Sequence, residues 1–190
     1  MEAFPFRAVA PSRSYEGIDR MPACAVLDCV RSLYNVGSFF RTGDAAGLSC
    51  LYLTGYTGHP PHPRLSKTAL GAEDHLPWEH HPEAVPLLQT LRQRGYELVA
   101  IETSPQAVDL YDWQPSFPAC LVFGSEVEGI SSAVAQTCDV HVRIPMLGAK
   151  QSLNVAVAGG VVLFELLRKY RLLHDRFRNR SGASSAAPSR

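Results

Sequence analysis

The amino-acid sequence predicts an α/β fold, in which a mostly parallel β-sheet is covered by helices on both faces. Two observations support this prediction. Short apolar runs of strand length alternate along the chain with longer segments of helical periodicity, as in folds whose strands are buried on both faces. The chain has 190 residues, of which 46% are hydrophobic, so it can bury one core of this class but hardly two.

Five apolar runs are predicted to form the strands. Each is short and bounded by turn residues, which is the pattern of a buried strand. In chain order the runs are Ala23–Leu27, Cys50–Thr54, Glu97–Ile101, Ala119–Phe123 and Val140–Ile144. The five cysteines lie in apolar stretches and form no C-x-x-C pair, so we interpret them as small buried hydrophobic residues.

Three helices are predicted between these strands. In chain order they cover Val36–Ala46, Pro82–Arg94 and Ser131–Thr137. A polar side chain that can accept a hydrogen bond from the first turn favours the start of a helix. The first helix is therefore expected to have Asn35 as its N-cap, and the third is expected to be capped by Ser131 or Ser132.

The last predicted helix runs from Ser152, its expected N-cap, to about Leu173. Its apolar residues recur three and four positions apart, at Leu153, Val157, Val161, Phe164 and Leu167. Within it, Gly159 and Gly160 each cost about 1 kcal/mol relative to alanine in an isolated helix. We therefore expect another helix to pack closely there, from the same chain or from a second subunit.

The two ends of the chain differ from its centre. Residues 1–20 have no clear period and are expected to form an extended arm, followed by one domain over 21–173 and a disordered basic tail over 174–190. After residue 167 there are seven basic residues and one acid, a charge of +6, against 11 basic and 17 acidic residues before it, a charge of −6. The basic end indicates either an anionic partner or a merely solvated tail.

Several classes of protein are excluded by missing patterns. No apolar run approaches the roughly 18 residues that span a bilayer, and no signal peptide is evident, so a cytoplasmic protein is expected. Neither a P-loop nor the G-x-G-x-x-G dinucleotide motif occurs. No metal site is expected, because the histidines lack metal-ligand spacing and are interpreted as loop residues: His59, His62, His80 and His81.

Polar residues follow the predicted strands, where open α/β sheets bind their ligands. In segment 35–47, Arg41 lies among apolar helix residues and is either functional or paired with Asp44. Segment 121–130 leads a strand into a turn bracketed by two glycines, which is either a ligand loop or an ordinary connection. In segment 144–155, Asn154 would lie inside the last helix, where its side chain competes with the backbone, so we favour a functional role for it.

Three motifs in these segments carry a resemblance to a known family. They are N-x-G-x-x-x-R at 35–41, G-S-E-x-x-G-I at 124–130 and I-P-M-x-G-x-x-x-S-L-N-V at 144–155. In this order they resemble the three motifs of the SpoU (TrmH-like) class of SPOUT RNA methyltransferases. The resemblance covers about residues 22–170, including Lys67–Glu73, and departs at Gly43, where relatives often carry alanine.

The resemblance implies a SPOUT-type α/β fold with a deep C-terminal trefoil knot, and an obligate homodimer. It also implies methyl transfer from S-adenosylmethionine to a ribose 2′-hydroxyl of RNA without a metal. The expected RNA is tRNA, with rRNA as the alternative, and neither DNA nor a membrane is an expected partner. Two further interpretations are a non-catalytic RNA-binding dimer and a base-methylating SPOUT enzyme.

Site residues follow from the same resemblance. The implied cofactor-binding residues are Ile101, Glu102, Thr103, Gly124, Ile144, Met146, Ser152 and Leu153, and the implied catalytic residues are Arg41, Asn35, Glu126 and Asn154. Because a guanidinium stays protonated, Arg41 is interpreted mainly as a cation that binds phosphate and eases loss of the hydroxyl proton, with proton abstraction left open. The other three are expected to orient Arg41, with Glu126 as its ion-pair partner. Further phosphate contacts are expected from Arg31, Arg64, Lys67 and Lys150.

Overall fold

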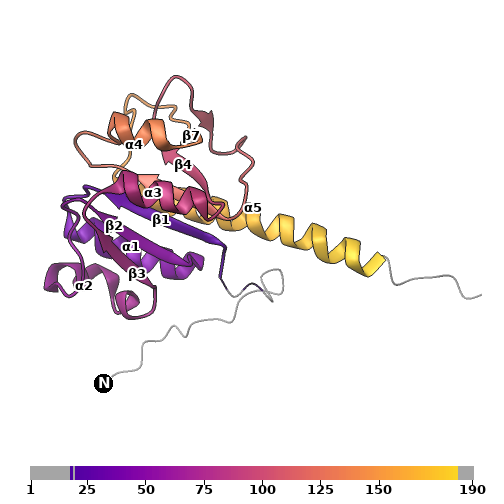
Figure 1. Cartoon of the computed structure of the whole chain (residues 1–190), viewed down its shortest axis with the longest axis horizontal. Coiled ribbons are helices and arrows are strands. Elements are labelled where there is room, and N and C mark those ends of the chain that lie inside the picture. The colour runs from indigo at the N-terminus through magenta and orange to yellow at the C-terminus, as the bar shows by residue number, and fades with distance from the viewer. Residues whose placement is uncertain (1–17, 19, 184–190) are drawn as a thin grey trace, which may run out of the picture.

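The computed structural model describes residue 18 and residues 20–183, with side chains as far as residue 175. This part of the chain forms one sheet of seven parallel strands in the order β3-β2-β1-β6-β4-β7-β5. Five of these strands, β1, β2, β3, β4 and β7, are labelled in Figure 1. The strands are β1 (Ala23–Asp28), β2 (Cys50–Thr54), β3 (Trp78–His81), β4 (Glu97–Ile101), β5 (Val108–Asp109), β6 (Ala119–Phe123) and β7 (Val140–Arg143). The predicted parallel α/β class is confirmed.

Helices cover both faces of the sheet, as predicted. They are α1 (Leu33–Ala46), α2 (Pro63–Ala69), α3 (Ala84–Gln93), α4 (Ser132–Thr137) and α5 (Val155–Ala183), with a short 3-10 helix η2 (Ala72–Asp74). In β1, Ala25 and Leu27 join the core beneath α1, α2 and α5, whereas Cys24 and Val26 join the core beneath α3 and α4. Successive strand residues thus point to opposite faces, and both faces are apolar.

All five predicted strands are present, and their bounds differ from the prediction by at most one residue. The strands β3 and β5 were not predicted. They form the two edges of the sheet, where one side of a strand is unpaired, so polar side chains such as Glu79 are tolerated. The prediction that His80 and His81 lie in a loop is wrong, because both belong to β3.

All five cysteines are free, and the interpretation of them as small buried hydrophobic residues is confirmed for two of the five. Cys24 and Cys120 are buried, and the other three are half-buried. Burial raises the pKa of Cys50 to about 11 and the pKa of Cys138 to about 12. Such thiols remain protonated at neutral pH, so they pack as apolar groups rather than react.

The predicted N-caps of α1 and α5 are wrong, whereas the predicted cap of α4 at Ser131 is confirmed. Helix α1 begins at Leu33, and its N-cap is Ser32, whose Oγ accepts a hydrogen bond from the backbone N–H of Asn35 at 3.3 Å. Helix α5 begins at Val155 rather than next to Ser152. In both cases a different polar residue nearby accepts hydrogen bonds from the backbone N–H groups of the first turn. Tertiary contacts decide which polar residue does so.

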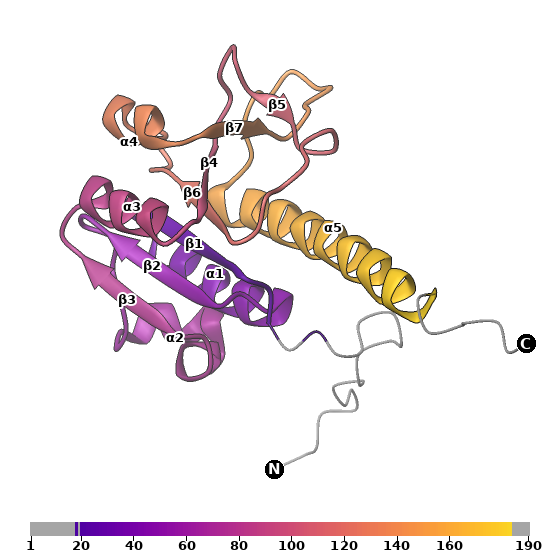
Figure 2. The ribbon, with the colours of Figure 1, turned by 45° about the vertical axis from the view of Figure 1, so that its right-hand side comes forward.

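The predicted disordered tail from residue 174 is wrong as far as Ala183, because α5 continues to that residue (Figure 2). A helix that is already formed extends at little cost through good helix formers such as arginine. Arg171 and Asp175 add an ion pair of 3.1 Å one turn apart. Residues 184–190 and the predicted arm, except residues 18 and 20, lie outside the described residues. The helices in the described part of the chain include no candidate for a membrane span.

The two adjacent glycines of α5 have different surroundings. A Cβ on Gly159 would overlap ring atoms of Phe39, so this glycine lets α5 approach α1 closely. A Cβ on Gly160 would meet no atom within 4 Å. The expected close helix contact is therefore confirmed within the chain at Gly159, while Gly160 faces open space.

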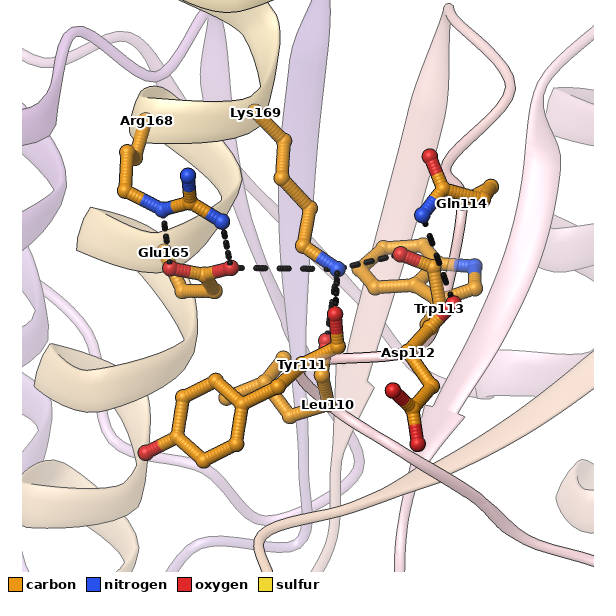
Figure 3. A network of polar contacts seen from close by, with 8 residues as sticks. All are labelled: Leu110, Tyr111, Asp112, Trp113, Gln114, Glu165, Arg168 and Lys169. Atoms are coloured by element: carbon orange, nitrogen blue, oxygen red, sulfur yellow. Dashed lines mark hydrogen bonds and ion pairs between the residues drawn. The ribbon is translucent and has the colours of Figure 1, made fainter.

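Lys169 ties α5 to the loop that follows β5 (Figure 3). Its Nζ donates hydrogen bonds to the carbonyl oxygens of Leu110 at 2.7 Å, Tyr111 at 3.2 Å and Trp113. It also lies 3.8 Å from a carboxylate oxygen of Glu165. Burial lowers the pKa of Lys169, and the attraction of Glu165 opposes this shift. The buried ammonium is tolerated because its hydrogen-bonding capacity is used.

Two glycines of α1 provide a test of how closely this helix packs against its neighbours. A Cβ on Gly37 would overlap the backbone oxygen of Leu65, whereas a Cβ on Gly43 would meet only flexible leucine side chains at 2.9 Å or more. We expect Gly37→Ala to lower the free energy of unfolding by about 1–3 kcal/mol, because backbone cannot move aside cheaply. Gly43→Ala is the control and should change it by no more than about 1 kcal/mol. Urea denaturation measures both, and equal effects would contradict the packing described.

Candidate active site

A cavity of about 540 Å³ opens at the carboxyl ends of β4, β6 and β7. The loops that follow these three strands form its walls. All eight residues predicted to bind the cofactor line it: Ile101, Glu102, Thr103, Gly124, Ile144, Met146, Ser152 and Leu153. Segments far apart in the sequence therefore meet at one edge of the sheet, as expected for ligand sites of parallel sheets.

Two of the walls are joined by Glu102. One of its carboxylate oxygens accepts a hydrogen bond from the backbone N–H of Thr103 at 2.8 Å, and the other accepts one from the backbone N–H of Ile130 at 3.1 Å. The loop after β6 is itself tightly folded, because a Cβ on Gly124 would overlap the backbone of Gly129. Only glycine fits at position 124, which explains the glycine bracket seen in the sequence.

The third wall, residues 145–153, has an unusual property. No residue of this segment makes a hydrogen bond with any other residue that the structure describes. Four of its residues line the cavity, namely Met146, Gln151, Ser152 and Leu153, so their backbone N–H and C=O groups are free to bind a ligand.

Glu126 caps the start of α1. Its carboxylate accepts hydrogen bonds from the backbone N–H groups of Arg31 at 2.9 Å and Ser32 at 3.1 Å, and from Nδ2 of Asn35 at 2.8 Å. Partial burial by itself would raise the pKa of Glu126, but these hydrogen bonds outweigh it and lower the pKa. The predicted ion pair between Glu126 and Arg41 is not made, because the helix start takes up the carboxylate.

Asn154 caps the start of α5. Its Oδ1 accepts hydrogen bonds from the backbone N–H groups of Ala156 at 2.9 Å and Val157 at 3.3 Å. Its Nδ2 donates to Oδ1 of Asn35 at 3.2 Å. The expectation that Asn154 lies inside the helix is therefore wrong, and capping explains its position. We call the hydrogen-bonded set of Asn35, Glu126 and Asn154 the polar clamp.

Arg41 stands apart from the polar clamp. It is exposed on α1, it does not line the cavity, and its side chain makes no hydrogen bond or ion pair with any other described residue. The predicted pairing with Asp44 is not made either, because Asp44 lies 4.0 Å from Arg20 instead. The expectation that the other three residues orient Arg41 is therefore wrong for the single chain.

The remaining predicted cations are exposed. Arg31, Arg64, Lys67 and Lys150 make no ion pair with the described residues. The part of the chain that the structure describes contains no group of three or more potential metal ligands. Sequence reasoning missed the contribution of backbone N–H groups at Arg31 and Ser32, since a backbone donor carries no residue-type signal.

The pKa shift of Glu126 predicts a pH-dependent contribution to stability. Because its pKa is lowered on folding, the contribution is present above the pKa of the unfolded chain, about 4.3, and is lost as the pH falls through the folded value. We expect Glu126→Gln to lower the urea midpoint at neutral pH, with the difference from wild type shrinking below about pH 4. Glu128→Gln, two residues away and with no hydrogen bond to its carboxylate, is the control and should show no such trend.

Comparison with known proteins agrees with this geometry. The 23S rRNA (guanosine-2′-O-)-methyltransferase RlmB of Ralstonia nicotianae is 35% identical over 154 residues, which cover 81% of this chain and 61% of that protein. The crystal structure of the A. aeolicus TrmH/SpoU tRNA modifying enzyme has a TM-score of 0.73 and 30% identity, covering 80% of this chain and 77% of that one. An AdoMet-bound rRNA methyltransferase from Sinorhizobium meliloti has a TM-score of 0.73 and 30% identity, covering 83% and 60%.

The chain spans about three fifths of the length of the first curated relatives that it matches. The sequence model of the SpoU rRNA Methylase family matches residues 22–164, a region that contains β1, the polar clamp and the whole cavity. The resemblance seen in the three motifs is confirmed, and this chain belongs to the SpoU rRNA methylase family.

Proposed function

We propose that this chain transfers a methyl group from S-adenosylmethionine to a ribose 2′-hydroxyl of RNA. The observation that carries the proposal is the convergence of the second and third motif segments on one cavity, with Asn35 of the first motif joined to both through the polar clamp. The names of the relatives from R. nicotianae and S. meliloti support the reaction and the donor.

The cavity suits the proposed donor. Its volume of about 540 Å³ lies within the range of roughly 300–1,000 Å³ that is usual for small-molecule sites. Ile101 and Ile144 offer apolar contacts, and the free backbone groups of 145–153 offer hydrogen bonds. When bound, the donor supplies an electrophilic methyl group on a positively charged sulfur, which suits the carboxylates of Glu102 and Glu126 in the lining.

Arg41 is proposed to assist the ribose oxygen. A neutral hydroxyl is a poor nucleophile, so the site must stabilise charge as the proton leaves. The guanidinium of Arg41 has no partner among the described residues, so its N–H groups are free to bind phosphate and that oxygen. Since Arg41 does not line the cavity of its own chain, we propose that each cavity uses the Arg41 of a second copy.

A homodimer is proposed to form through the α5 stripe, which we define as Val157, Gly160 and Phe164 of α5 together with Leu153, two residues before the helix begins. These residues recur three or four positions apart, and Leu153, Val157 and Phe164 are 39%, 54% and 49% exposed. The open space at Gly160 would let a second helix approach closely. The C-terminal trefoil knot stays a prediction that the sheet order is consistent with.

The substrate is proposed to be tRNA in the cytoplasm, with rRNA as the alternative. The A. aeolicus tRNA modifying enzyme is matched over 77% of its length, more than the rRNA enzymes above. Arg31, Arg64, Lys67 and Lys150 would bind phosphates. Mass spectrometry of ribose-methylated nucleosides from cells with and without the protein tests the proposal, and unchanged nucleosides in both tRNA and rRNA would refute it.

Removal of Arg41 should abolish the reaction without unfolding the chain. We expect Arg41→Ala to lower methyl transfer from labelled donor to RNA by at least about 100-fold, the scale of losing one charge-stabilising group. Arg94→Ala, which removes an exposed arginine at the end of α3, is the control and should retain activity. Ser152→Trp fills the cavity of a chain that keeps its Arg41. Mixing this variant with Arg41→Ala should restore activity if Arg41 acts across the dimer, because the mixed dimer pairs an intact cavity with an intact Arg41. No restoration would refute that arrangement.

A charge in the α5 stripe should break the dimer. We expect Val157→Glu to give monomers by light scattering, because a carboxylate would be buried between subunits without a partner. Gln89→Glu introduces the same group at an exposed position of α3 and should leave the dimer intact. A dimer that survives Val157→Glu would show that another face is used.

A further inference from the structure

We propose that His141 is a positioning residue for the cofactor-binding loop after β4, acting through Ser104. This inference rests on the proposed function. His141 lies on β7 and does not line the cavity, although its neighbours Val142 and Arg143 do. It can therefore affect a bound donor only through other residues.

The hydrogen bonds of His141 define its tautomer. Its Nε2 lies 3.1 Å from the carbonyl oxygen of Ala135, and a carbonyl can only accept, so Nε2 carries the hydrogen. In the neutral ring Nδ1 is then an acceptor. It receives a hydrogen bond from Oγ of Ser104 at 3.0 Å, and the side-chain nitrogen of Gln106 lies 3.4 Å away.

These contacts link the loop after β4 to α4 through residues that do not line the cavity. Ser104 directly follows Thr103, which lines the cavity, while Ala135 belongs to α4, which follows the loop after β6. Glu102 makes the corresponding link on the cavity side through Ile130. The loop after β4 is thus held from both sides, and loss of the His141 contact should leave Thr103 less well positioned.

A double-mutant cycle tests the proposal. We expect Ser104→Ala and His141→Phe each to weaken S-adenosylmethionine binding about three- to tenfold by calorimetry, the usual scale for one hydrogen bond. The double variant should lose no more than His141→Phe alone, because that exchange already removes the contact with Ser104. His141→Asn, whose Oδ1 can still accept from Ser104, should recover most of the affinity. Additive losses, or unchanged affinity in both single variants, would overturn the proposal.

Controls and a second measurement separate this proposal from the proposed function. His75→Phe and Ser116→Ala make the same exchanges at exposed residues whose side chains have no hydrogen bond, and should leave binding unchanged. Hydrogen exchange of the amides of 102–107 needs no donor. Faster exchange in Ser104→Ala and His141→Phe would support the link between the loop after β4 and α4, whether or not the wild type binds the donor. Unchanged exchange would refute that link. A wild type that fails to bind the donor would refute the proposed function alone.

Discussion

The polar clamp is the interaction on which the rest of the site depends. Asn35 joins Glu126 and Asn154, residues 91 and 119 positions away in the sequence. Through these hydrogen bonds the starts of α1 and α5 and the loop after β6 are held together. Glu126 and Asn154 also satisfy backbone N–H groups that the two helix starts leave unpaired. One small set of polar groups thus caps two helices and shapes the cavity wall.

The order of the strands makes this clamp possible. Because β6 lies between β1 and β4, the loop that follows β6 comes beside the start of α1. Because β7 pairs with β4, the segment that follows β7 lines the same cavity as Glu102. The close approach of Gly124 to Gly129 keeps the loop after β6 tightly folded.

In a single chain, Arg41 and the α5 stripe lack contacts that a second copy would supply. Arg41 binds no described residue, and the side chains of the α5 stripe are about half exposed. Of the four residues that the motifs single out for catalysis, Asn35, Glu126 and Asn154 are hydrogen-bonded to one another within the chain. The fourth, Arg41, is not part of this set. A second copy that covers the stripe would account for both features, because it would bury the apolar side chains and could bring its own Arg41 to the cavity.

Residue types and their spacing were enough to predict the central strands, and the motif resemblance was enough to predict residues that line the cavity. A strand buried on both faces must be apolar at nearly every position, so runs such as Ala119–Phe123 were recognisable locally, whereas the edge strands β3 and β5 were not. The polar residues that cap α1 and α5 could not be predicted in this way. Ser32 and Asn35, or Ser152 and Asn154, are all competent caps by residue type. The choice depends on whether a distant carboxylate or amide arrives beside them, and that depends on the order of the strands in space.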